Sequence, residues 1–145
     1  MEARISDVSS IKNFVNGGNA TFTIRNPSTG GRFTFKVREG RDEHAPRFVS
    51  VLSGPDNTAD FSYLGCIFEG DRFVVTSKSR IKPDAPSAKA FRWLHERLTA
   101  GRDLGPVEFF HEGRCARCGR TLTVPESITT GFGPECVKHV TTEAA

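Results

Sequence analysis

The stretch ATFTIRNPSTGGRFTFKVR, residues 20–38, alternates apolar and polar residues on both sides of the polar segment NPSTGG. A two-residue period is typical of half-buried strands, and Asn, Pro, Ser and Gly favour turns. The pattern therefore predicts an antiparallel hairpin with one face toward a core. The core-facing residues would be Phe22, Ile24, Phe33, Phe35 and Val37. The polar face would carry Thr21, Thr23, Arg25, Arg32, Thr34, Lys36 and Arg38.

Three further segments have the composition of strands and are separated by turn-forming residues: 47–52, 61–68 and 72–77. The period becomes helical at Pro86, where PSAKAFRWLHERLTAG places four apolar residues on one face: Ala88, Phe91, Leu94 and Leu98. Pro86 suits a first helical turn and Gly101 suits a helix end. A shorter helix is expected at residues 8–16, capped by Ser9 or Ser10.

These elements predict an α+β fold, in which an antiparallel sheet of about five strands packs on one main helix. The segment RDLGP (102–106) reads as a linker, and VEFFH (107–111) as a short strand that leads into a cysteine-rich segment. We therefore expect two units. The first is an α+β domain over residues 1–105, and the second is a zinc-ribbon or treble-clef-like module over residues 106–145.

The composition indicates a protein of the cytoplasm with reduced thiols. The chain has 145 residues and a formal net charge of +3. It contains no apolar run that approaches the roughly 20 residues needed to cross a bilayer, and its first residues, MEARISDVSS, do not form an apolar signal segment. Cys66 lies alone in an apolar run and is expected to be a small buried residue.

The other three cysteines have the spacing of metal ligands. Cys115 and Cys118 form a C-x2-C step, and Cys136 is followed by His139. The whole pattern, C-x2-C-x17-C-x2-H, supplies four nitrogen and sulfur ligands, the tetrahedral set of structural zinc. A redox pair would need the C-x2-C step at the start of a helix after a strand. A catalytic zinc site would keep one coordination position open, and neither an H-x-E signature nor a paired acid supports such a site here.

The same segment resembles a known family. The pattern C-x2-C-G-R-x-L-T-x-P-E-S-I-x2-G-x-G-P-x-C is similar to the zinc-binding family numbered 6011 among domains of unknown function, whose members occur in bacteriophages and actinobacteria. The matching residues are Cys115, Cys118, Gly119, Arg120, Leu122, Thr123, Pro125, Glu126, Ser127, Ile128, Gly131, Gly133, Pro134 and Cys136. The resemblance implies a small phage or prophage protein in the host cytosol, with a zinc module and no implied activity.

The resemblance also leaves the fourth ligand open. Members of the family often lack a Cys or His three residues after the last cysteine, and some carry the His-Glu-Gly found here at residues 111–113. His111 therefore competes with His139. Paired ligands at each end of the segment favour His139, and Glu126 or water is a third alternative.

The rest of the chain offers charge rather than catalytic patterns. We find no Ser-His-Asp arrangement, no paired carboxylates and no nucleotide motif with local support. Basic residues of the hairpin and of the segment SKSRIKP are candidates for contacts with DNA or RNA phosphates: Arg25, Arg32, Lys36, Arg38, Lys78, Arg80 and Lys82. Because the aromatic residues of the hairpin have the core-facing parity, base stacking on this face is not expected.

We therefore expect a non-enzymatic, zinc-stabilised phage or prophage binding protein. Its first-choice partner is nucleic acid or a nucleoprotein complex. The alternative is a protein that inhibits a host defence or regulatory complex through protein–protein contacts. Neither a membrane nor a small-molecule substrate is expected as a partner.

Overall fold

The computed structural model describes residues 3–40, 45–53, 61–68, 72–111, 113–118 and 131–132. The helices are α1 (Val8–Val15) and α2 (Pro86–Thr99). The strands are β1 (Ala3–Arg4), β2 (Asn19–Arg25), β3 (Arg32–Arg38), β4 (Arg47–Leu52), β5 (Phe61–Phe68), β6 (Arg72–Val74) and β7 (Glu108–His111). In this part of the chain the strands form one antiparallel sheet, in the order β1-β7-β2-β3-β4-β5-β6.

The α+β class and the antiparallel sheet are confirmed, and the predicted hairpin is β2 and β3. Their register pairs Thr21 with Lys36, Phe22 with Phe35 and Thr23 with Thr34. The number of strands is larger than expected, because β7 and the two-residue β1 extend the sheet beyond β2. The last predicted strand is shorter than expected and ends at Val74.

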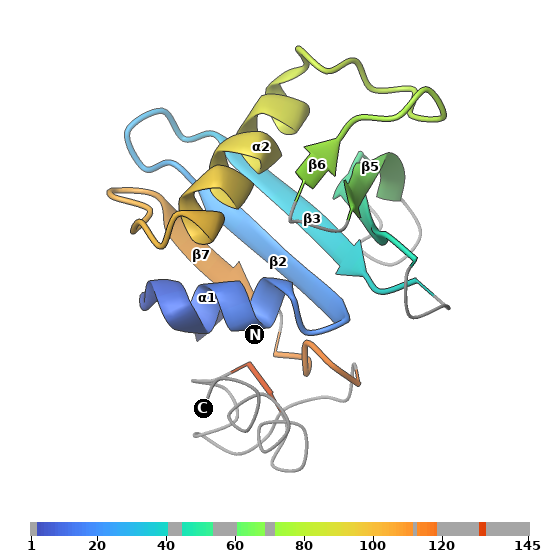
Figure 1. Cartoon of the computed structure of the whole chain (residues 1–145). Coiled ribbons are helices and arrows are strands. Elements are labelled where there is room, and N and C mark those ends of the chain that lie inside the picture. The colour runs from blue at the N-terminus through green and yellow to red at the C-terminus, as the bar shows by residue number, and fades with distance from the viewer. Residues whose placement is uncertain are drawn as a thin grey trace.

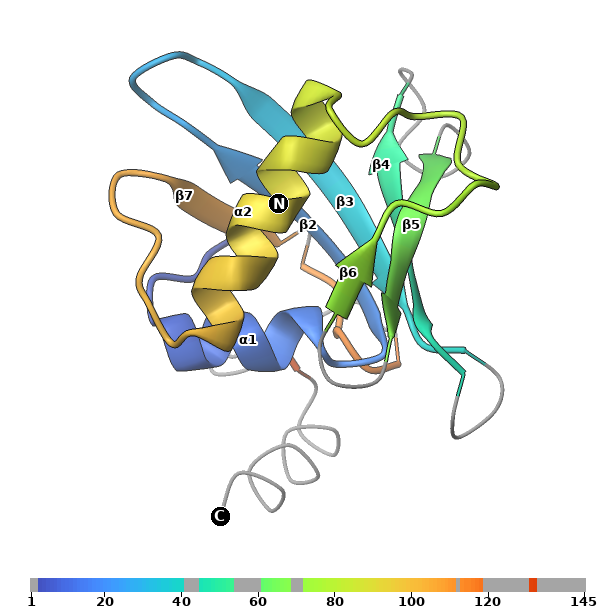
Figure 2. The same cartoon turned by 45° about the horizontal axis from the view of Figure 1, so that its top comes forward.

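Both described helices lie on the same face of the sheet (Figures 1 and 2). α2 crosses β2 and β3, and its Phe91 ring contacts Phe35 at 5.2 Å between centroids. α1 lies near the end of the sheet at which β7 finishes, and its Phe14 contacts Phe22 and Phe109 at 6.5 and 5.8 Å. The aromatic residues that the alternation assigned to the core face thus pack against the two helices.

The helix ends follow local chemistry. The carboxylate of Asp7 caps α1 by accepting a hydrogen bond from the Ser10 amide at 3.0 Å, so the expectation of a serine cap was wrong. Asp serves as well as Ser here, because either side-chain oxygen can accept from an unpaired helical N–H. Pro86 begins α2 as expected, and Gly101, at a φ of 69°, follows its last turn.

The sheet and core continue past the predicted boundary at residue 105. β7 lies between β1 and β2, and the Cys115 and Ala116 side chains are fully buried in the same apolar cluster as Phe14. The division into units 1–105 and 106–145 remains a prediction, as does the zinc-ribbon or treble-clef-like shape, because residues 119–130 and 133–145 lie outside the described ranges. None of the helices described here is long and apolar enough to cross a membrane.

Candidate nucleic-acid interface and metal site

The sheet face opposite the helices carries most of the predicted basic residues. Strand alternation and register put the side chains of Arg25, Arg32, Lys36 and Arg38 on this face, which we call the open face. The same register extends it to Arg4 on β1, Glu108 on β7 and Arg72 on β6. The described strands thus place six basic side chains and one carboxylate on the open face.

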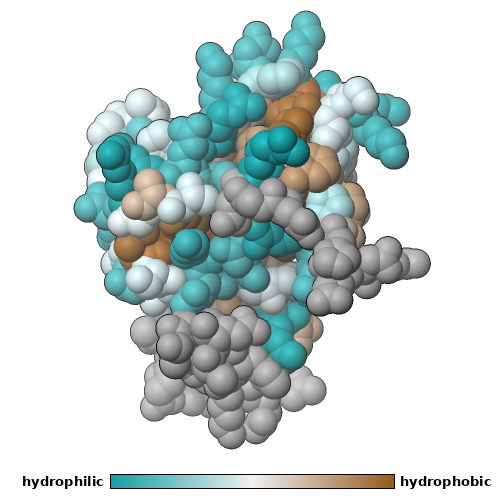
Figure 3. All heavy atoms as spheres, in the orientation of Figure 1, coloured by the Kyte–Doolittle hydropathy of each residue, from teal (hydrophilic) through white to brown (hydrophobic). Residues whose placement is uncertain are grey.

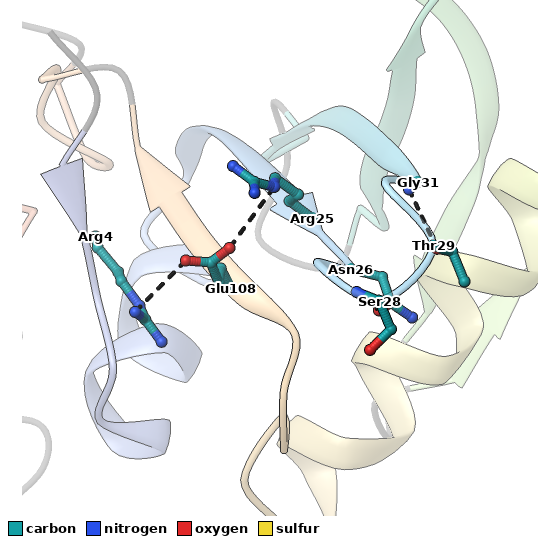
Figure 4. Close-up of polar contacts among 7 residues, drawn as sticks. All are labelled: Arg4, Arg25, Asn26, Ser28, Thr29, Gly31 and Glu108. Carbon is teal, nitrogen blue, oxygen red and sulfur yellow. Dashed lines mark hydrogen bonds and ion pairs between the residues drawn. The ribbon is translucent and has the colours of Figure 1, made fainter.

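Glu108 is shared by two arginines of neighbouring strands. Its carboxylate lies 3.5 Å from Arg4 and 3.7 Å from Arg25, and both guanidinium groups approach it from either side of β7 (Figure 4). Both arginine side chains are about half exposed. One carboxylate balances one of these two charges, so this corner of the face keeps a positive charge.

The centre of the open face is packed rather than solvated. Thr23 and Thr34 stand directly opposite each other, and their hydroxyl oxygens are 2.7 Å apart. Both residues are buried, with 3% and 8% of their surface exposed. The polar face predicted for the hairpin is therefore not exposed at these two positions, and their neighbours in register include larger side chains on adjacent strands, such as Phe110 opposite Thr23.

Those larger side chains include aromatic residues that the hairpin alone did not show. Phe110 pairs with Thr23, Phe48 pairs with Arg38, and Phe61 pairs with Leu52, which places all three rings on the open face. Phe48 is 43% exposed and is the only exposed large apolar residue in the described ranges. The core-facing parity predicted for the aromatic residues of the hairpin is confirmed in β2 and β3, and the rings of the open face come from the neighbouring strands.

A register shift in β5 explains part of this arrangement. Leu64 is the extra residue of a bulge opposite Val49 and Ser50. Because of it, Tyr63 pairs with Ser50 on the open face, whereas Cys66, three residues later, pairs with Phe48 on the same face. Strict alternation across FSYLGCIF would have put these two residues on opposite faces.

Basic and aromatic side chains meet within the open face. The Lys36 ammonium group lies 4.5 Å from the centre of the Phe61 ring, and the Arg72 guanidinium group lies 5.7 Å from that of Phe68. The first cation–π contact joins β3 to β5 across β4, and the second joins the paired strands β5 and β6. Ring faces and cations therefore lie within reach of a single ligand.

Tyr63 and Cys66 form a small polar cluster at the β5 end of this face. The Tyr63 hydroxyl lies 2.9 Å from Cys66 Sγ and 2.8 Å from the Thr76 hydroxyl. Burial raises the pKa of Tyr63 above its ordinary value, and the hydrogen bond with Cys66 raises it further. Cys66 is buried, as the sequence predicted.

The other predicted basic residues lie elsewhere. Lys78, Arg80 and Lys82 are exposed in the loop between β6 and α2. This loop is anchored to the sheet where the Ser79 hydroxyl donates to the Tyr63 carbonyl at 3.1 Å. The loop thus starts at the β6 edge, away from the corner formed by β1, β7 and Arg25.

A cavity of about 460 Å³ opens between α2, the β2–β3 turn and the loop after α2. Its wall includes Ile24, Phe33, Trp93 and Leu104, with Arg97 lying 5.3 Å over the Trp93 ring. Figure 3 shows apolar side chains at the left edge of the molecule, where the loop after α2 lies in Figure 1. None of the described residues that line this cavity is Asp, Glu, His or Cys.

The turn that carries the first two predicted zinc ligands packs against the core through Cys115. Cys115 is fully buried, Cys118 is exposed, and the Arg117 amide donates to Cys115 Sγ at 3.4 Å. The Ala116 carbonyl accepts from the Asn19 amide at 2.7 Å. A Cβ on Gly17 would approach that carbonyl to 2.7 Å, so the turn before β2 needs glycine there.

A second contact ties this pair to residues near the third cysteine. The Ala116 amide donates to the Gly131 carbonyl at 2.9 Å, and the Phe132 ring contacts Phe14 at 6.3 Å. Gly131 has a φ of 79°, and a Cβ there would overlap the Phe14 ring. Gly131 and Phe132 are therefore held beside the Cys115 turn.

His111 is fully buried and stacks on Phe14 with ring centroids 5.3 Å apart. Its Nδ1 accepts a hydrogen bond from the Gly113 amide at 2.9 Å. A neutral imidazole with an accepting Nδ1 carries its proton on Nε2. Of the predicted ligands, Cys136 and His139 lie outside the described residues, as does the alternative Glu126, and no cluster of three potential metal ligands occurs among the residues described.

The comparison with protein families concerns this same segment. Residues 105–141 match the model of a family of unknown function (DUF6011). The DUF6011 match covers β7 and all three clustered cysteines, and its description names no activity, metal or partner. No curated protein and no solved structure is similar enough to the chain to give a match.

Proposed function

We propose that this chain is a non-enzymatic nucleic-acid-binding protein stabilised by zinc, and that its open sheet face contacts the nucleic acid. The observation that carries the proposal is the gathering, within the described strands, of six basic side chains on one sheet face with a single carboxylate among them. Cationic side chains bind phosphates by releasing condensed counterions. Phage or prophage origin rests on the resemblance of the cysteine segment alone, whereas a nucleoprotein complex as partner rests, like nucleic acid itself, on the basic side chains.

Zinc would be held by Cys115, Cys118, Cys136 and His139. The amide of Arg117 directed at Cys115 Sγ fits a thiolate, because backbone N–H groups stabilise sulfur that carries negative charge. His139 suits the fourth position better than His111, because Nδ1 of His111 already accepts a hydrogen bond from the Gly113 amide, whereas the second ring nitrogen of a zinc ligand normally donates one. In this arrangement zinc stabilises the turn that packs on α1.

A binding role fits the chemistry of the described surface better than an enzymatic one. Among the described residues, the wall of the cavity beside α2 carries no Asp, Glu, His or Cys, the one carboxylate of the open face, Glu108, is shared between two arginines, and Cys66 is buried against the Tyr63 hydroxyl. General acid–base or nucleophilic catalysis needs an activated group with a partner in reach.

Charge reversal tests the proposal. Arg32→Glu with Lys36→Glu changes two positions of the open face, and Lys89→Glu, on the exposed side of α2, is the matched control. We expect the double variant to lose at least ten-fold in affinity for a labelled oligonucleotide at low salt, and the control to stay close to the parent protein. Equal affinities in all three proteins would contradict the proposal.

The second candidate is a protein–protein inhibitor of a host defence or regulatory complex. The exposed Phe48 favours it, because protein interfaces are centred on accessible aromatic residues. Capture of the same host protein by nuclease-treated parent protein, and its loss with Phe48→Ala, together with no binding to oligonucleotides, would support this candidate over the first.

A further inference from the structure

We propose that the open face binds single-stranded nucleic acid, with bases stacked on Phe48, Phe61 and Phe110 and phosphates held by the basic side chains between them. The inference rests on the proposed function and specifies its ligand. Duplex DNA or RNA hides its base faces in the stack, so only an unpaired strand can use exposed aromatic rings.

Phe48 is the first stacking position. It is the most accessible of the three rings and stands directly across from Arg38, which is also exposed. Opposed side chains on adjacent antiparallel strands have Cβ atoms about 5 Å apart. A base on the Phe48 ring would therefore place its own phosphate near the Arg38 guanidinium group.

Phe61 is the second position, and its cation is already in place. Lys36 lies over the Phe61 ring at 4.5 Å. A base stacking on the ring would displace the ammonium group, which could then meet the phosphate of the same nucleotide. A cation–π contact at an exposed site is weaker than the stacking of a base on an aromatic ring, so the exchange favours binding.

Phe110 provides the third position at the other side of the face. It lies between Thr23 on β2 and Arg4 on β1, next to the shared Glu108. β7 and β5 are separated by four strand spacings, about 19 Å, so Phe110 and Phe61 must hold different nucleotides. Between them lie the buried pair of Thr23 and Thr34 and, in the next row of the same face, the half-buried Lys36.

The composition of the face distinguishes it from a protein-docking surface. Its aromatic rings alternate with positively charged side chains instead of gathering into an apolar patch. Of the three rings, Phe48 is exposed, whereas Phe61 and Phe110 are half-buried. Stacking platforms for single strands combine ring faces with a positive track for the backbone. The charge of the face is complementary to a polyanion.

Stacking can be observed directly with a tryptophan reporter. The chain has one tryptophan, Trp93, on the opposite side of the sheet, so Phe48→Trp in a Trp93→Phe background places the only indole on the open face. We expect single-stranded oligothymidine to quench its emission, and a duplex of equal phosphate number to leave it unchanged. Two results would overturn the inference. One is equal quenching of the indole emission by the single strand and the duplex, and the other is binding of the single strand without quenching.

Affinity measurements separate this inference from the proposed function. With zinc-loaded protein, Phe48→Ala should weaken single-strand binding at least about five-fold and leave duplex binding unchanged, whereas Phe48→Tyr should retain affinity. Equal binding of both ligands with no effect of Phe48→Ala would overturn the stacking model and leave the nucleic-acid function standing. No binding of either ligand at low salt would overturn both.

Discussion

The Lys36 ammonium group lies 4.5 Å from the centre of the Phe61 ring, which joins a cation of β3 to an aromatic residue of β5 across β4. The contact needs three strands in register, with Ser50 of β4 paired to both Lys36 and Tyr63. It shows that the basic and aromatic residues of the open face form one surface.

Removing the Lys36 charge should change binding more than stability. Lys36→Met keeps the aliphatic stem and removes the ammonium group, whose cation–π contact contributes about 0.5–1 kcal/mol. We expect the slope of log affinity against log salt to become shallower by about one ion, because one phosphate contact is lost. Lys89→Met on α2 is the control, and an equal change of slope in both variants would contradict the assignment.

The buried hydroxyl pair of Thr23 and Thr34 should show strong coupling. Each single Thr→Val substitution leaves the other hydroxyl without its partner, which costs about 1–3 kcal/mol, whereas the double substitution removes both polar groups. We expect the double variant to be more stable than the sum of the single effects. Chemical denaturation of the four proteins measures this, and additive effects would show that the pair is not coupled.

Zinc release should identify the fourth ligand. Because Nδ1 of His111 accepts from the Gly113 amide, we expect His139→Ala to speed zinc release to a chelator at least ten-fold. His111→Ala should lower stability instead, by about 2 kcal/mol or more, because it leaves a cavity against Phe14, and zinc should stay bound at one equivalent per chain. Fast release from the His111 variant alone would reverse the assignment, and slow release from both would point to Glu126 or water.

The single tyrosine gives a pH prediction. The folded state holds the Tyr63 proton to higher pH than the unfolded state, whose phenol titrates near its ordinary pKa of 10.0. Stability from this group is therefore complete below about pH 10 and falls as pH rises toward the folded pKa. Absorbance titration of the phenol should give a midpoint above 10 in the native protein, and a midpoint at or below 10 would show that burial does not control it.

Much of the fold could be predicted from residue alternation and helical periodicity. The hairpin of β2 and β3 and the apolar face of α2 follow directly from these patterns, because each has one dominant period. β1 has only two residues and is a strand because it pairs with β7, so the local sequence carries no alternation from which it could be predicted. The asparagine-led turn at residues 26–31 was recognisable from composition, and Asn26 Oδ1 indeed accepts from the Ser28 amide.

The aromatic half of the candidate interface could not be predicted in the same way. In RFVSVL and FSYLGCIF both parities carry apolar residues, so composition does not say which side chains face the core. Phe109 and Phe110 are adjacent, and only pairing with β2 shows that Phe110 lies on the open face. The bulge at Leu64 is a property of strand pairing, which the sequence of β5 alone does not display.

The salt dependence of oligonucleotide binding tests the central claim most directly. Fluorescence anisotropy with a labelled single strand should show binding by the zinc-loaded protein at low salt. The logarithm of the affinity should fall linearly with the logarithm of salt concentration, with a slope that corresponds to several released counterions. Absence of binding at low salt by folded, zinc-loaded protein, or an affinity that does not change with salt, would contradict the account.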